Sequence, residues 1–96
     1  MEMQLEELPN IGRSIAADLR RIGIMNSGDL SGLEPLATYR RLAEVMGSRH
    51  DPCVFHVLLA VRYFFESGVP LPWWRFAEEG ERLLVAAQPL KRGTSE

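Results

Sequence analysis

The sequence predicts an all-α protein, a compact single domain of about five to six short helices. Three observations support this class. Apolar residues recur three or four positions apart over most of the chain, which is the period of a helix buried on one face. Proline and capping residues precede these segments, and glycine follows several of them. No segment alternates apolar and polar residues between turn residues, as a half-buried strand does.

A tight turn separates the first two expected helices. A short helix is predicted over residues 2–8, and Pro9 and Asn10 end it, because asparagine tolerates a positive φ better than other non-glycine residues. A second helix is predicted from residue 13 to residue 22. Gly23 is the expected residue after its end. The apolar face of this helix consists of Ile15, Leu19 and Ile22.

Capping residues mark the next helices. A short helix is expected over residues 28–33, with Asn26 or Ser27 as its cap. Pro35 opens the next helix, since proline at the first turn loses no hydrogen bond, and Gly47 ends it.

A long apolar helix and an aromatic segment complete the domain. Asp51 and Pro52 open a helix that reaches about Ser67 and is apolar nearly all round, which places it at the centre of the core. A last helix is expected from Trp73 to about residue 87. We expect residues 1–87 to form one domain and residues 88–96 a flexible tail.

Composition narrows the functional classes. The 96 residues suffice for one domain, and the formal charge of −2 does not by itself favour nucleic acid. Residues 8–50 nevertheless carry an excess of two positive charges. The lone cysteine, Cys53, excludes an internal disulfide. The acidic first residues and the short apolar runs predict a cytoplasmic protein without a membrane span.

The residue spacing of one segment indicates how it could bind an anion. Residues 8–24 read LPNIGRSIAADLRRIGI, a turn followed directly by an amphipathic helix. Gly12 lacks a Cβ, so another backbone can approach, and the N–H groups at the helix start form an anion site. A hairpin with a purely structural role is the alternative interpretation. The predicted phosphate-binding residues are Asn10, Ile11, Gly12, Arg13, Ser14, Arg20 and Arg21.

This segment resembles the helix-hairpin-helix motif of proteins that bind DNA without sequence specificity. The resemblance implies that the domain is built on helix-hairpin-helix units and that backbone amides in the hairpin contact the phosphates of one strand. It assigns Ile11, Gly12 and Arg13 to the hairpin. Asn10 stands where the usual pattern has its first glycine. The packing positions that it implies are Ala16, Leu19 and Ile22.

The resemblance extends over residues 8–76. The hairpin is followed by DLSGL, YRRL, DPCVFHVL and PWW, in that order. This order resembles a small bacterial family of helix-hairpin-helix proteins known by the names pathogenicity locus and mitomycin resistance. It is also similar to the C-terminal domain of TfoX/Sxy-type competence regulators. The family implies an all-α fold and a DNA contact, and it supplies no reaction.

Two chemical alternatives involve His50, Cys53 and His56. Their spacing of three could place them around a metal ion, but three ligands make a poor tetrahedral set. A reactive Cys–His pair lacks an orienting third group, although the first turn of a helix can lower a thiol pKa. The preferred interpretation is a buried cysteine and a histidine on the helix surface, with no metal and no catalysis.

The aromatic residues after residue 62 allow two interpretations. They could stack on bases, as in proteins that bind single strands. Completion of the core, together with a patch for a protein partner, is the preferred interpretation. Two adjacent tryptophans cannot both point inward from one helix, so either Trp73 or Trp74 is expected to be partly exposed.

The sequence therefore predicts a non-catalytic module that binds the DNA backbone, with duplex DNA as its partner. Arg40 and Arg41 are accessory basic residues. Non-specific contacts give a Kd of roughly 10⁻⁴–10⁻⁶ M at physiological salt, so a monomer should bind weakly. A homodimer, a second hairpin over residues 24–46 or a protein partner would raise the affinity. No cofactor or small-molecule substrate is expected. The competing prediction is a protein-interaction adaptor that uses Trp73, Trp74 and Phe76.

Overall fold

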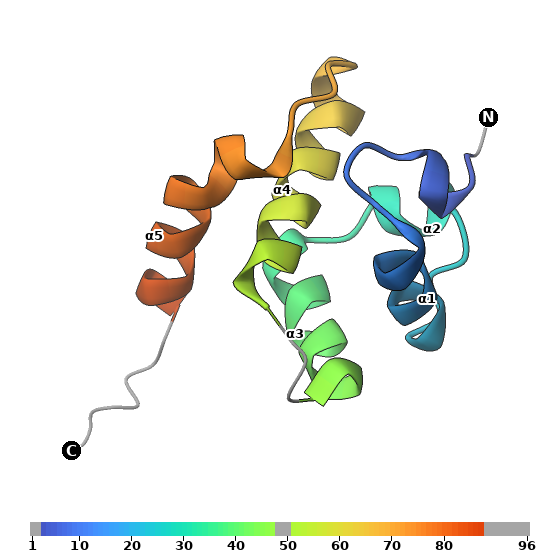
Figure 1. Ribbon diagram of the computed structural model, residues 1–96, viewed down its shortest axis with the longest axis horizontal. Coiled ribbons are helices and arrows are strands. Elements are labelled where there is room, and N and C mark those ends of the chain that lie inside the picture. The colour runs from blue at the N-terminus through green and yellow to red at the C-terminus, as the bar shows by residue number, and fades with distance from the viewer. Residues whose placement is uncertain (1–2, 48–50, 88–96) are drawn as a thin grey trace.

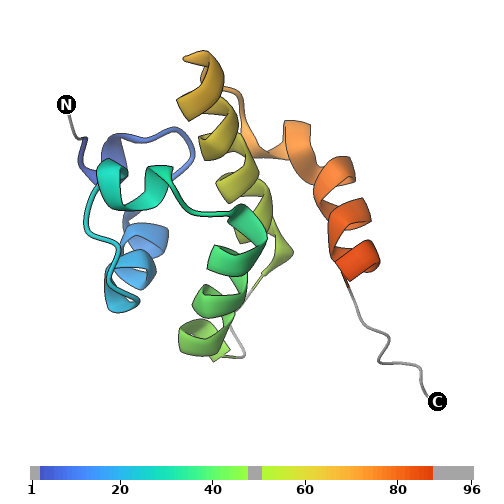
Figure 2. The same ribbon diagram turned by 180° about the vertical axis from the view of Figure 1, so that it is seen from behind.

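The computed structural model describes residues 3–47 and 51–87 and confirms the all-α class. The described backbone forms helices throughout, apart from loops and one isolated bridge between Gln4 and Asn26. None of the described helices is long and apolar enough to cross a membrane. The tail expected at 88–96 lies outside the described residues. The helices in chain order (Figures 1 and 2) are η1 (Leu5–Glu7), α1 (Arg13–Arg21), α2 (Ser27–Ser31), α3 (Pro35–Met46), α4 (Pro52–Ser67), η3 (Trp73–Phe76) and α5 (Ala77–Ala87).

The N-terminal segment forms less helix than its sequence predicts. Only one 3-10 turn, η1, is present where a helix over residues 2–8 was expected, and residues 1–2 lie outside the described part. The Ser27 N–H donates to the Met3 carbonyl at 2.9 Å, and the Met3 N–H donates to Ser27 Oγ at 2.8 Å. The segment before η1 is therefore extended, because its backbone groups pair with the start of α2.

Helix α1 ends one residue earlier than expected, and its buried stripe is shifted. Leu19 is fully buried, as predicted, and so is Ala16. Ile15 and Ile22, which were expected to face inward with Leu19, are only partly buried. The charged side chain of Asp18 is also buried, at only 6% exposed. Helix α1 contacts both η1 and α3, so it buries a broader surface than the single face that the spacing indicates.

Side-chain caps start the next three helices, and the sequence predicted two of them, Asn26 and Asp51. Asn26 Oδ1 accepts a hydrogen bond from the Asp29 N–H at 3.0 Å, and α2 begins at Ser27 rather than at residue 28. The Glu34 carboxylate accepts from two N–H groups in the first turn of α3. Asp51 Oδ1 accepts from the Cys53 N–H at 2.8 Å. Each cap pairs N–H groups that the first turn of a helix leaves without a carbonyl partner.

Helix α4 is the centre of the molecule. Every residue from Val54 to Val61 is buried, as predicted for a segment that is apolar nearly all round. Figure 1 shows α4 between α3 and α5, and η3 packs across it. Gly68 ends the helix with φ 78°, a left-handed conformation that suits glycine.

The last predicted helix has two parts. Its first turn is the 3-10 helix η3, and α5 begins only at Ala77. Helix α5 packs on α4 and η3, and Gly80 in its first turns is buried against the His56 ring. A Cβ on Gly80 would overlap His56 Cδ2 and lie 2.7 Å from Nε2. The glycine in this helix therefore permits a close approach to α4.

Candidate functional site

The turn between η1 and α1 has the backbone conformation that the sequence predicts. Asn10 has φ 70°, the one positive φ among the described non-glycine residues. Ile11 follows it and is only 4% exposed, so its side chain anchors the turn in the core. The Ile11 N–H donates to the Leu8 carbonyl at 3.3 Å. Since Ile11 is fixed in the core, its contribution to a phosphate site is to hold the turn in place.

The start of α1 is exposed and carries no capping side chain. Gly12 occupies the cap position, and Gly12, Arg13 and Ser14 are all exposed to solvent. The first helical hydrogen bond here joins the Ala16 N–H to the Gly12 carbonyl at 3.0 Å. The N–H groups before Ala16 in the first turn have no carbonyl partner within the helix. They point outward at the positive end of the helix dipole, as an anion site requires.

Asn10 connects this turn to a segment far along the chain. Asn10 Nδ2 donates to the Leu71 carbonyl at 2.7 Å, and the Trp73 N–H donates to Asn10 Oδ1 at 3.2 Å. In Figure 1 the turn and the loop before η3 lie near one another beside α4. Sequence reasoning placed Asn10 in the hairpin and missed this second role. Its side chain attaches the hairpin to the aromatic segment.

Of the three arginines placed at the predicted phosphate site, two are paired. Arg20 donates to both Glu6 carboxylate oxygens, at 2.9 and 3.0 Å. These bonds hold the pKa of Glu6 below its ordinary value and raise the pKa of Arg20. Arg21 lies 3.6 Å from an Asp18 oxygen. Arg13 is exposed beside the open helix start. The geometry therefore favours Arg13 as the cation that meets an anion at the turn.

The two accessory arginines of α3 are bonded to backbone carbonyls. Arg41 donates to the Ile22 carbonyl at 2.6 Å, just past the end of α1. Arg40 donates to the Ala87 carbonyl at 3.4 Å, at the end of α5. Both residues are exposed. Their guanidinium groups satisfy carbonyls at helix C-termini, where a positive charge also interacts favourably with the helix dipole.

The aromatic residues of η3 separate into a packed pair and an exposed ring. Trp73 stacks on His56 with centroids 6.1 Å apart and 15° between the ring planes. Phe76 packs against Tyr63, with ring centroids 5.8 Å apart. Trp74 is 60% exposed, which confirms that one of the two adjacent tryptophans is exposed. Trp73 and Phe76 therefore belong to the α4 contact, and Trp74 is the member of this set that a partner would meet.

The expectation that His56 lies on the helix surface is wrong. Its side chain is 3% exposed, between Trp73 and Gly80, and neither ring nitrogen has a hydrogen-bond partner within the described structure. Burial lowers the pKa of His56, and the charges of Glu81 and Asp51 act in the opposite direction. The reason for the error is that α5 covers this side of α4, which the spacing within α4 does not reveal.

Cys53 is half-buried in the first turn of α4. Burial and the neighbouring Asp51 raise the pKa of its thiol, so the helix start does not produce a reactive thiolate here. His50, the third residue of the weighed metal set, lies outside the described residues. Within the described ranges, no three histidine, cysteine, aspartate or glutamate side chains gather closely enough to hold a metal ion.

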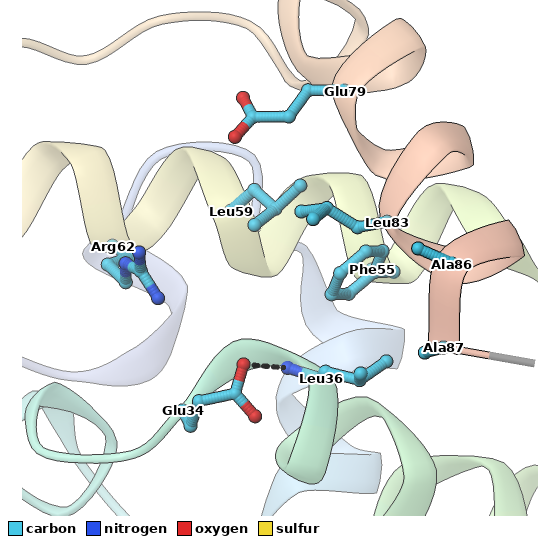
Figure 3. Close-up of a pocket in the computed structure, with 9 residues that line it drawn as sticks. All are labelled: Glu34, Leu36, Phe55, Leu59, Arg62, Glu79, Leu83, Ala86 and Ala87. Atoms are coloured by element: carbon cyan, nitrogen blue, oxygen red, sulfur yellow. Dashed lines mark hydrogen bonds between the residues drawn. The ribbon is translucent and has the colours of Figure 1, made fainter.

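A groove of about 400 Å³ lies between α3, α4 and α5. Figure 3 shows Phe55 of α4 between Leu83 of α5 and Leu36 of α3, with Leu59 of α4 beside Leu83. Its rim carries charged side chains, and that of Glu34 already caps α3. Sequence reasoning missed this groove, because the distance between α3 and α5 is set by their separate packing on α4. The groove offers mainly apolar surface.

Fold and site together define a small all-α protein with an open helix start beside an exposed arginine. The chain belongs to the pathogenicity locus family: the sequence model of that family, Cdd1, matches residues 2–82. A relative, the mitomycin resistance protein McrB of Streptomyces lavendulae, is 35% identical over 81 residues, which cover 84% of this chain and 77% of the relative. No solved structure matches the chain.

Proposed function

We propose that this protein is a non-catalytic module that binds DNA through its backbone phosphates, without sequence specificity. The observation that carries the proposal is the uncapped, exposed start of α1, with Arg13 beside it. Contacts from backbone N–H groups and a guanidinium to phosphate oxygens position a strand and carry no sequence information. The turn resembles the hairpin of helix-hairpin-helix proteins, and residues 8–76 are similar to the C-terminal domain of TfoX/Sxy-type regulators.

The anchoring of the turn supports this proposal. Ile11 is buried and the Asn10 side chain is held by two hydrogen bonds, so the N–H groups of the following residues are fixed before any ligand arrives. A fixed site loses little conformational entropy on binding. The contact is nevertheless small, because Arg20 and Arg21 already have carboxylate partners. A monomer should therefore bind no more tightly than the roughly 10⁻⁴–10⁻⁶ M of non-specific contacts.

The test is a titration of labelled duplex DNA at several salt concentrations, followed by fluorescence anisotropy. The affinity of the wild type should fall as salt rises, since binding releases counterions from the phosphates. Arg13→Glu should bind more weakly and show a smaller salt slope. The matched control is Arg82→Glu, which makes the same charge change on α5, far from the turn (Figure 1). Absence of binding at low salt, or equal losses in both variants, would refute the proposal.

The competing proposal is a protein-interaction adaptor in which the hairpin is purely structural. It is supported by the 60% exposure of Trp74. On this proposal Trp74→Ala weakens self-association, measured by analytical ultracentrifugation, while Arg13→Glu leaves it unchanged. A sedimentation profile that does not respond to Trp74→Ala would count against self-association through this residue.

A further inference from the structure

The two tryptophans of η3 have different environments. Trp73 stacks on the buried His56, whereas Trp74 is 60% exposed, the largest exposed fraction among the described aromatic side chains. A 3-10 helix has three residues per turn, so Trp73 and Phe76 share the face that packs on α4. Trp74 therefore points away from the core.

Trp74 also lies close to the hairpin turn. The Trp73 N–H is 3.2 Å from Asn10 Oδ1, and Trp74 is the next residue. Because successive Cα atoms are 3.8 Å apart, the Trp74 backbone lies within about 8 Å of the Asn10 side chain. Gly12, at the open start of α1, is two residues beyond Asn10 and adds up to about 7 Å of backbone, so the whole path corresponds to a few nucleotides of a single strand. A strand held at the turn through its phosphate can thus bring a base to the indole ring.

The segment that leads to Trp74 is held by hydrogen bonds and by ring stacking. Asn10 bonds to the Leu71 carbonyl and to the Trp73 N–H, and the Trp73 ring stacks on His56. Pro70 and Pro72 restrict the φ angles of the loop that leads to it. The indole is therefore presented from a rigid support, which reduces the entropy cost of a contact.

We propose that Trp74 stacks on an unpaired base of the strand whose phosphate the turn holds, so that single-stranded DNA is the preferred ligand. This inference rests on the proposed phosphate site. In a duplex, both faces of each base are covered by its neighbours, whereas an unpaired base exposes a face to an aromatic ring. Arg75, the next residue, is exposed and adds a second positive charge beside the ring. The preference for a base over a protein surface follows from the attachment of the Trp74 segment to the turn that precedes the phosphate site.

The experiment compares a labelled thymidine oligonucleotide with a duplex of equal length, by anisotropy at low salt. Stacking on an aromatic side chain contributes roughly 1–3 kcal/mol per base, so Trp74→Ala should weaken single-strand binding about 5- to 150-fold and change duplex binding little. Trp74→Phe should retain most of the affinity, because it keeps a flat ring. Trp74→Leu should behave like the alanine variant, because leucine keeps apolar bulk but has no flat ring. Val85→Ala, at an exposed apolar residue of α5, is the control and should bind as the wild type does.

Each outcome separates this inference from the proposed function. If both DNAs bind and depend on Arg13 while Trp74→Ala binds the oligonucleotide like the wild type, the stacking inference is wrong and the phosphate site stands. If neither DNA binds at low salt, both proposals fail. If Trp74→Leu retains full affinity, the contact is apolar rather than stacked, which also refutes the inference and favours a protein surface. Circular dichroism of each variant confirms that it is folded.

Discussion

Asn10 is the residue on which the candidate site depends most. Its positive φ reverses the chain between η1 and α1, and its amide group joins that reversal to the loop before η3. A glycine would permit the same backbone with less strain, but it could not make these two bonds. An asparagine therefore does here what a glycine could not, because it combines the positive φ with two side-chain hydrogen bonds. The two functional surfaces predicted from the sequence are thus mechanically connected.

Substitutions at Asn10 separate its two roles. Asn10→Gly keeps the positive φ and loses both side-chain hydrogen bonds, so we expect a loss of about 1–3 kcal/mol in the free energy of unfolding. Asn10→Ala should lose a further 1–2 kcal/mol, approximately, because a Cβ strains the left-handed conformation. Urea denaturation followed by circular dichroism measures both values.

Asn10→Asp is the informative control. Aspartate tolerates a positive φ and still accepts from the Trp73 N–H, but it cannot donate to the Leu71 carbonyl. Its stability should be lower than that of the wild type, because a carboxylate oxygen would face the Leu71 carbonyl oxygen with no hydrogen between them. If Asn10→Gly is as stable as the wild type, the connection between turn and loop contributes nothing to the fold.

At the scale of elements, the interface between α4 and α5 brings the His56 ring close to the backbone of Gly80. His56 of α4 lies directly against Gly80 of α5, and Trp73 of η3 covers the ring on another side. Glycine inside a helix costs about 1 kcal/mol relative to alanine. The structure explains why glycine stands here, because the close contact with the His56 ring leaves no room for a Cβ.

Gly80→Ala should destabilise the protein although it raises helix propensity. The new Cβ would overlap the His56 ring, and overpacking of a core contact costs typically 1–3 kcal/mol, which exceeds the gain in propensity. The measurement is the free energy of unfolding in urea. Gly32→Ala is the matched control: its φ is −95° and a Cβ there meets no atom within 4 Å, so it should change stability by less than about 0.5 kcal/mol.

A double-mutant cycle with His56→Ala identifies the cause. If Gly80→Ala destabilises the protein by overlapping the His56 ring, then His56→Ala removes most of that loss in the free energy of unfolding. The double variant then loses less stability than the sum of the two single losses. Additive losses would mean that the alanine at position 80 is tolerated poorly for another reason.

At the scale of the whole molecule, the fold is an arrangement of helices on α4. Helix α3 and the pair formed by η3 and α5 each pack on α4, and α1 reaches the core through α3. His56 therefore lies under the C-terminal part of the fold, with both ring nitrogens buried and without partners in the described structure. A proton on this ring would place an unpaired charge inside the core. The attachment of η3 and α5 to α4 should consequently depend on pH.

We expect stability to fall in mild acid because of His56. Burial lowers the pKa of this histidine in the folded state, so the unfolded chain binds the proton more readily. The stability that the neutral His56 ring contributes is complete above the pKa of the unfolded state, about 6.5. It is lost as pH falls from there toward the lower pKa of the folded state. Urea denaturation at a series of pH values measures the slope. His56→Phe cannot titrate and should show a smaller decline over this interval; an identical slope would assign the effect to other groups.

The local structure of this chain could be predicted because neighbouring residues determine it. The caps at Asn26 and Asp51, the positive φ at Asn10 and the burial of α4 on all sides follow from propensities and spacing within a few residues. The same local signals identified the open start of α1. Even the family is indicated by the order of short motifs along the chain.

Contacts between distant residues decided the rest. The bonds from Asn10 to Leu71 and Trp73 cross 61 and 63 positions of the sequence, and no local pattern encodes them. The burial of His56 depends on a helix that begins 21 residues later, at Ala77. The pairing of Arg20 with Glu6 depends on how η1 folds back onto α1. The sequence by itself determined the helices and the turn before α1, whereas the tertiary structure decided which side chains remain available to a ligand, because burial and pairing depend on packing between helices.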